Sequence, residues 1–185
     1  MTFPHFAVPT DDYDFGDDVA VGDFDHRPET RIEEGQILVV DDDPNAAAFM
    51  RRLIERDGFL RVLTAGDGRR ALELLVEHPP DVVVLDVHLP QVDGLEVLRE
   101  IVRRDERTGR PTGVLAVSGD PSSQTCQSML WAGADDFIPR PFPGAEFTMR
   151  VRRVATRTQA LRRALAYSRF LERRLDDLSA PEFPA

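Results

Sequence analysis

The sequence predicts an α/β fold: a doubly wound sheet of five parallel strands in the order 2-1-3-4-5, followed by a long C-terminal helix. Two observations lead to this prediction. Short apolar runs recur along the chain, and segments with a helical period alternate with them. Because right-handed helical crossovers must pack against the sheet, this alternation implies a parallel sheet covered on both faces.

The predicted strands are the apolar runs. They are ILVV at 37–40, FLRVLTA at 59–65, VVVL at 82–85, VLAV at 114–117 and DDFI at 135–138, of which FLRVLTA is the weakest. A strand buried on both faces has a continuous apolar sequence, so VVVL is expected at the centre of the sheet.

The predicted helices include FMRRLIERDGF at 49–59, ALELLVEH at 71–78 and LEVLREIVRR at 95–104. Their boundaries carry capping residues: Asp43 precedes Pro44 at a first helical position, and Asp93 precedes the helix at 95–104. We therefore assign Asp43 and Asp93 to helix capping.

A single long helix is predicted from about Phe142 to Leu178, and its residues after about Arg157 are expected to extend beyond the domain. A heptad-like seam with a shift near Ser168 runs along it through Phe147, Val151, Val154, Thr158, Leu161, Leu165, Ser168, Leu171, Leu175 and Leu178. We expect the extension to form a parallel homodimer. The alternative is a solvated helix stabilised by its own arginine and acid pairs.

The chain thus divides into four segments. Residues 1–33 are expected to be a disordered acidic tail, 36–150 the α/β domain, 151–178 the helical extension and 179–185 a disordered end. Residues 1–35 hold ten acids against two arginines, and no period of a strand or helix emerges there. The alternative for this tail is a docking segment that becomes ordered on a partner.

Composition excludes several classes of protein. The net charge of −10 argues against direct nucleic-acid binding. No apolar run is long enough to span a membrane and no secretory signal is present, so we expect a soluble cytoplasmic protein. The single cysteine, Cys126, cannot form an internal disulfide or a zinc site. All 23 basic residues are arginine.

Carboxylates follow two strands that are neighbours in the predicted sheet. Asp41 and Asp42 end the first strand, and Asp86 ends the third. Ligands of such sheets lie outside the carboxyl ends of the strands, where the strand order reverses. Three carboxylates crowded there repel one another unless a divalent cation neutralises them, and an oxygen-only site suits Mg²⁺.

A carboxylate beside Mg²⁺ can attack a phosphoryl group. The product then needs a hydroxyl and a cation to bind its oxygens. Ser118 follows the fourth strand and offers the hydroxyl, while Arg140 follows the fifth and offers the cation.

Four motifs resemble the landmarks of the receiver domain of two-component response regulators, a flavodoxin-like fold. They are VVDD at 39–42, LDVHLPQVDG at 85–94, VSGD at 117–120 and GADDFIPRPF at 133–142, and they agree in order and spacing. The resemblance covers about residues 36–150.

The resemblance implies a role for each site residue. Asp86 is the expected phosphoacceptor, with Asp41 and Asp42 as the acidic pair that holds Mg²⁺. His88 is expected to lend its backbone carbonyl to the metal. Ser118 resembles the hydroxyl that follows the phosphoryl group, and Phe137 the switch aromatic. The peptide bond before Pro141 is expected to be cis.

Arg140 departs from the family, which has a lysine at this position. An arginine is bulkier, planar and bidentate, so the exchange is not neutral. One hypothesis is a phosphorylated regulatory switch that is not an enzyme, partnered by a histidine kinase or phosphotransfer protein. The alternative is a pseudo-receiver, an interaction module that works without phosphorylation.

A more remote alternative is a haloacid-dehalogenase-like phosphatase. Its nucleophile signature, Asp-x-Asp, occurs within DDD at 41–43, but LDVHLPQVDG stays unexplained by it. The sequence after Leu178 cannot fold alone. The chain is therefore expected to be either a stand-alone regulator or the front of a longer protein whose output domain cannot be chosen from the sequence.

Overall fold

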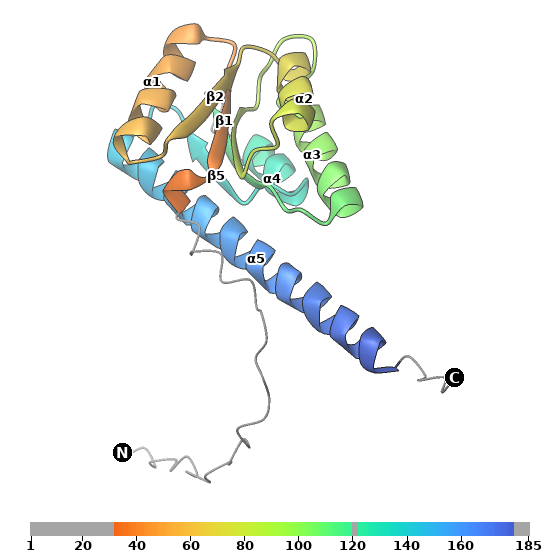
Figure 1. Ribbon diagram of the computed structural model, residues 1–185. Coiled ribbons are helices and arrows are strands. Elements are labelled where there is room, and N and C mark those ends of the chain that lie inside the picture. Colours follow the sequence, from red (N-terminus) through yellow and green to blue (C-terminus); the bar gives the residue numbers. More distant parts are fainter. Residues whose placement is uncertain (1–31, 120–121, 180–185) are drawn as a thin grey trace, which may run out of the picture.

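The computed structural model describes residues 32–119 and 122–179, and for residues 123 and 176–179 only the backbone. The predicted acidic tail and C-terminal end lie outside these residues, except that Ile32 and Glu33 belong to a short 3-10 helix and Ser179 to the last helix, where disorder was predicted. The elements in order are η1 (Ile32–Glu34), β1 (Gln36–Val40), α1 (Pro44–Arg56), β2 (Arg61–Ala65), α2 (Gly68–Glu77), β3 (Val82–Asp86), α3 (Gly94–Thr108), β4 (Gly113–Ser118), α4 (Ser123–Trp131), β5 (Asp136–Pro139) and α5 (Gly144–Ser179) (Figure 1).

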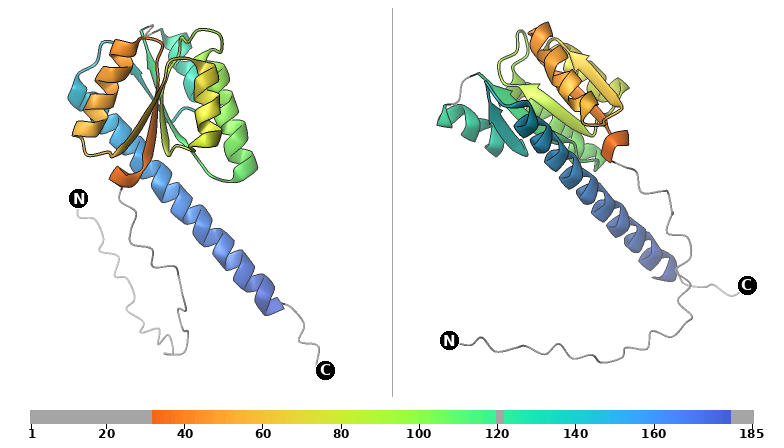
Figure 2. Two further views of the ribbon diagram at one scale, coloured as in Figure 1. Left: turned by 45° about the horizontal axis from the view of Figure 1, so that its top comes forward. Right: turned by 90° about the vertical axis from the view of Figure 1, so that its left-hand side faces the viewer.

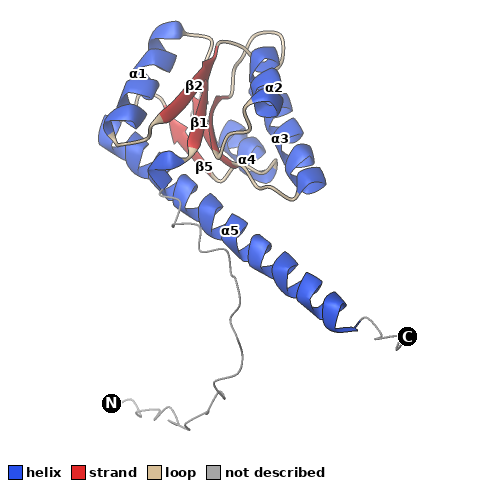
Figure 3. Ribbon diagram, in the orientation of Figure 1, coloured by secondary structure: helices blue, strands red, loops and turns tan. Residues whose placement is uncertain are grey.

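The five strands form one parallel sheet in the order β2-β1-β3-β4-β5. Helices cover both faces, and α5 runs on past the sheet as a long rod (Figure 3). The predicted fold class, strand order and long C-terminal helix are confirmed. Strand β3 lies at the centre, as its continuous apolar sequence predicts.

Each strand contributes alternate side chains to two separate cores. Figure 2 shows the helices that cover the two faces of the sheet. Val82 and Val84 point to the side of α1 and α5, while Val83 and Leu85 point to the side of α2, α3 and α4. All four are fully buried. Burying one such side chain stabilises the fold by about 1.5–3 kcal/mol, so the central strand is a rigid support for the residue at its end.

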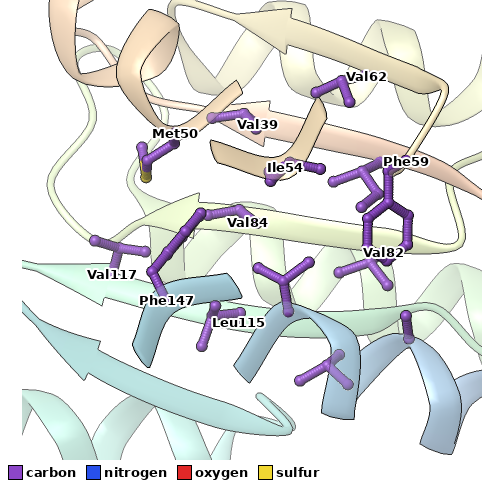
Figure 4. Close-up of a cluster of buried hydrophobic side chains, with 14 of the residues drawn as sticks. Val39, Met50, Ile54, Phe59, Val62, Val82, Val84, Leu115, Val117 and Phe147 are labelled. Carbon is purple, nitrogen blue, oxygen red and sulfur yellow. The ribbon is translucent and has the colours of Figure 1, made fainter. Parts of the chain in front are cut away.

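Ring and aliphatic packing fixes α5 over the sheet. Figure 4 shows Phe147 of α5 among Met50 of α1 and strand residues such as Val84. A side chain at Gly113, at the start of β4, would clash with α5, since a Cβ there would lie 2.3 Å from Thr158 Oγ1. The close approach of β4 and α5 therefore depends on this glycine.

The predicted helix caps are confirmed. The Asp43 carboxylate accepts from Asn45 N over 2.8 Å at the start of α1. The Asp93 carboxylate accepts from Leu95 N over 3.4 Å at the start of α3.

The C-terminal helix stays in contact with the domain further than the sequence predicts. Arg162 donates to the Asp81 carboxylate and to the carbonyl of Pro111, the latter over 2.6 Å. Arg169 donates to Gly109 O over 2.7 Å. The residues after Arg157 therefore run past the sheet, while long arginine side chains still hold them against loops of the domain, which are contacts that an apolar periodicity does not reveal.

Candidate functional site

The site lies at the carboxyl ends of the central strands. Asp41 directly follows β1, Asp86 is the last residue of β3, and Ser118 is the last residue of β4. Because β1, β3 and β4 are adjacent in the sheet, these ends meet at one edge. Asp41, Asp42 and Asp86 each offer an oxygen, and these oxygens lie within 4.8 Å of one another.

Backbone hydrogen bonds hold the two buried carboxylates in place. Asp41 N donates to Ala65 O over 3.0 Å, and the Asp41 carboxylate accepts from Asp43 N over 2.9 Å. The Asp86 carboxylate accepts from His88 N over 3.3 Å. Asp41 and Asp86 are buried, whereas Asp42 is exposed. The site thus has two buried carboxylates held by backbone hydrogen bonds and one carboxylate exposed to solvent.

Burial makes the two inner carboxylates costly to ionise. Burial raises the pKa of Asp41 above its ordinary value, and the hydrogen bond from Asp43 N and the charge of Arg140 offset this only in part. Burial likewise raises the pKa of Asp86, where Arg140 lowers it and Asp41 raises it further. An added cation would remove much of this cost.

Arg140 supplies one such positive charge. Its Nη1 lies 3.4 Å from Asp86 Oδ2, and its Nη2 donates to Asp41 Oδ2. Its backbone N donates to Ser118 O over 2.7 Å, and the Arg140–Pro141 peptide bond is cis, the isomer expected from the resemblance. The arginine therefore bridges the two carboxylates that were expected to hold a metal ion.

The donor set fits Mg²⁺. All the side-chain donors are carboxylate oxygens, they lie close enough to share one ion, and exposed Asp42 leaves room for water ligands. The imidazole of His88 is exposed, as expected for a residue that contributes only its backbone. The coordination of the metal by these residues stays a prediction.

The remaining predicted residues lie near the acidic pocket in different environments. Ser118 is fully buried at the end of β4. Phe137 of β5 is half-buried and packs against the core on the side of α2, α3 and α4. Their roles after phosphorylation stay predictions, since they concern a second state of the molecule.

Gly94 contributes to the site. From the sequence it was placed only before the start of a helix, and this contribution was not recognised. A Cβ at Gly94 would lie 2.2 Å from Asp86 O and 2.7 Å from Val87 O. Gly94 N also donates to Val87 O over 3.1 Å. The beginning of α3 can therefore pack directly on the backbone of the predicted phosphoacceptor. The pair Asp93-Gly94 in the sequence was the available signal.

The parallel sheet, with helices on both faces, defines a doubly wound α/β protein. Its acidic pocket lies at the carboxyl ends of the central strands, where the strand order reverses. A family model described as "Response regulator receiver domain" matches residues 37–152. The chain belongs to the response regulator receiver family. This assignment replaces the haloacid-dehalogenase-like alternative, and the relatives are regulatory proteins.

Curated relatives agree with the family. The chain is 41% identical over 123 residues to "Response regulator MprA" of Mycolicibacterium vanbaalenii, covering 66% of this chain and 51% of the relative. It is 38% identical over 124 residues to the protein of the same name from Mycobacterium leprae, covering 67% and 52%. The chain spans about half the length of these relatives.

Solved structures show the same fold. The receiver domain of Francisella response regulator 1452 aligns with a TM-score of 0.61 at 31% identity, covering 67% of this chain and 98% of that one. The receiver domain of NtrX from Brucella abortus aligns with a TM-score of 0.59 at 29% identity, covering 65% and 98%. Among the described residues, no helix is both long and apolar enough to cross a membrane.

Proposed function

We propose that the protein is a cytoplasmic switch in which Asp86 accepts a phosphoryl group from a histidine kinase or phosphotransfer protein. The observation that carries this proposal is the convergence of Asp41, Asp42 and Asp86, whose oxygens lie within 4.8 Å of one another at the strand ends. Mg²⁺ would be held by these three carboxylates and by the backbone carbonyl of His88.

In the transfer, a carboxylate oxygen of Asp86 attacks the phosphorus of the donor's phosphohistidine. A P–O bond forms as the P–N bond breaks, and the electron pair stays with the leaving imidazole, which takes up a proton. Mg²⁺, when bound, supplies positive charge for the phosphoryl oxygens. The rigid end of β3 keeps Asp86 in position, and Arg140 is near enough to exchange its contact with Asp86 for a phosphoryl oxygen.

Ser118 and Phe137 would respond to the phosphoryl group on Asp86. Ser118 Oγ would donate to a phosphoryl oxygen, drawing the loop after β4 inward, and Phe137 would turn into the space this leaves. The phosphoryl group would thereby shift an existing equilibrium between two conformations of the face formed by α4, β5 and α5.

The output element in this proposal is α5. In the part of α5 after Arg157, Leu161, Leu171 and Leu175 of the seam are 48%, 42% and 63% exposed. Apolar residues at heptad spacing suit a helical partner, so we propose that two copies pair through this extension as a parallel dimer.

A second candidate function is the pseudo-receiver. Arg140 already joins Asp41 and Asp86, which is what a metal ion would do. In that case the fold, its helix and its acidic tail would bind partners without phosphorylation.

Intact mass after incubation with Mg²⁺ and a small-molecule phosphodonor tests the two candidates. The native chain is expected to gain one phosphoryl group and Asp86→Asn none. Asp43→Asn is a matched control, since Asp43 is an exposed helix cap, and it should still be labelled. Absence of labelling in the native chain at every donor concentration would support the pseudo-receiver.

A further inference from the structure

A basic groove lies at the end of the sheet opposite the acidic pocket. Its volume is about 650 Å³, and η1, the first residues of β1 and β3, and one face of α5 form its walls. Figures 1 and 2 show η1 beside α5 at this end of the domain. The α5 residues that line it are Ala155, Gln159, Arg162, Arg163 and Ala166.

The groove is positive although the chain is acidic. Four arginines line it against two acids, Glu34 and Asp81, an excess of two positive charges. Asp81 is shared by Arg110 and Arg162. Burial lowers the pKa of Arg162 to about 10, so its guanidinium stays charged at neutral pH.

The other two arginines, Arg61 and Arg163, make no ion pair within the described part of the chain. Both are exposed at the groove. They are therefore available to carboxylates that the described residues do not supply.

The chain preceding η1 has the complementary charge. Residues 1–31 contain seven aspartates and one glutamate against Arg27 and Arg31, a net charge of −6, with aromatic residues interspersed. The chain enters the described structure at Ile32, which itself lines the groove. The acidic segment is thus tethered at the groove's edge.

Its attachment point is fixed to α5. Glu33 pairs with Arg152 over 2.8 Å, and Leu60 N donates to Glu33 O over 3.1 Å. Seven positions separate Asp25 from Ile32, and an extended chain of this length spans about 25 Å at most. A tether this short gives an effective concentration in the millimolar range, so weak contacts suffice for binding.

We propose that the acidic segment 11–29 of the same chain docks in this groove, its carboxylates on Arg61 and Arg163. The groove face of α5 differs from the heptad seam through Leu161 and Leu165, so docking leaves the seam available to a second helix. Docking would brace α5 where it leaves the domain. This inference does not depend on phosphorylation of Asp86.

Paramagnetic relaxation enhancement in the full-length chain tests the proposal. A spin label is attached to Ala20→Cys in a Cys126→Ser background, and ¹⁵N-labelled amide intensities are measured with and without reduction of the label. Amides of Gly35, Arg61 and Arg163 are expected to weaken at least about twofold, given a millimolar effective concentration. The effect should vanish in about 1 M salt, where the Debye length is about 3 Å.

The double variant Arg61→Glu/Arg163→Glu should abolish the broadening. Arg69→Glu/Arg99→Glu changes the charge equally on exposed helix positions elsewhere and should preserve it. Unbroadened groove amides, or equal loss in both double variants, would overturn the proposal. So would broadening seen only between spin-labelled ¹⁴N and unlabelled ¹⁵N chains, because the segment would then dock on a second copy.

Discussion

Arg140 Nη1 lies 3.4 Å from Asp86 Oδ2, and the same guanidinium also donates to Asp41. One side chain therefore ties together two carboxylates from adjacent strands, at the position where the family has lysine. We expect a divalent cation held by these carboxylates to displace this bridge. The strength of the Arg140 contacts is therefore expected to affect both Mg²⁺ binding and phosphorylation of Asp86.

Arg140→Lys is expected to tighten Mg²⁺ binding about tenfold, equivalent to about 1.4 kcal/mol. An ammonium is a point charge that does not bind two carboxylates in fork geometry, so it leaves the metal position more readily. Isothermal titration calorimetry of Mg²⁺ measures the change. Arg69→Lys, on an exposed position of α2, is the control. Unchanged or weaker binding by Arg140→Lys would show that the bridge does not compete with the ion.

Asp41→Asn is expected to stabilise the metal-free protein at neutral pH by about 1 kcal/mol. Burial raises the folded-state pKa of Asp41 above 3.8, so the native state binds this proton more tightly than the unfolded state. The ionised carboxyl therefore costs stability above the folded pKa, and that cost disappears as pH falls through it. Denaturant unfolding of both proteins across acidic and neutral pH measures this effect. The difference in free energy of unfolding between Asp41→Asn and the native chain should shrink toward low pH. A constant advantage would contradict this account.

Gly94→Ala is expected to destabilise the protein by about 1–3 kcal/mol, because its Cβ would overlap the Asp86 carbonyl. It should also slow labelling of Asp86, since α3 would push on the backbone that positions the carboxylate. Gly66→Ala is the matched control, because no atom lies within 4 Å of the place its Cβ would take. Thermal unfolding and phosphorylation rates measure the two effects, and equal behaviour of both variants would refute the role of Gly94.

The Arg162–Asp81 pair is expected to couple α5 to the domain by about 1 kcal/mol in a double-mutant cycle of Arg162→Gln and Asp81→Asn. Both side chains are mostly shielded from solvent, 19% and 29% exposed, so screening is limited. Hydrogen exchange of α5 after Thr158 should accelerate in each single variant. Arg174→Gln, further along the same helix, should leave it unchanged. Strictly additive effects would mean that the two residues do not interact energetically.

Leu161→Asp is expected to convert a dimeric chain to a monomer, because a charge in a heptad seam must be desolvated when helices pair. Thr156→Asp introduces the same charge on a different face of α5 and is the control. Sedimentation velocity over a concentration series measures both. A native chain that is monomeric throughout, or a dimer insensitive to Leu161→Asp, would exclude the seam as the interface.

The sequence alone determined the fold class, the strand order and the positions of Asp41, Asp42 and Asp86 at adjacent strand ends. The strands follow from local patterns, since apolar runs such as 82–85 specify buried strands. The strand order follows from the resemblance of the four motifs to the receiver family, because the handedness of the crossovers by itself leaves several orders open. The caps at Asp43 and Asp93 were equally readable, since a cap bonds to residues only two or three positions away.

Tertiary structure decided the contacts between residues far apart in the chain. The bridge from Arg140 to Asp86 spans 54 positions and that from Arg162 to Asp81 spans 81. No periodicity encodes such pairs, because an arginine in the sequence looks the same whether its side chain faces water or a distant carboxylate. The contacts of α5 with the domain depend on Arg162, and the charge balance of the acidic pocket depends on Arg140. Only packing the helices on the sheet brings their charges within reach.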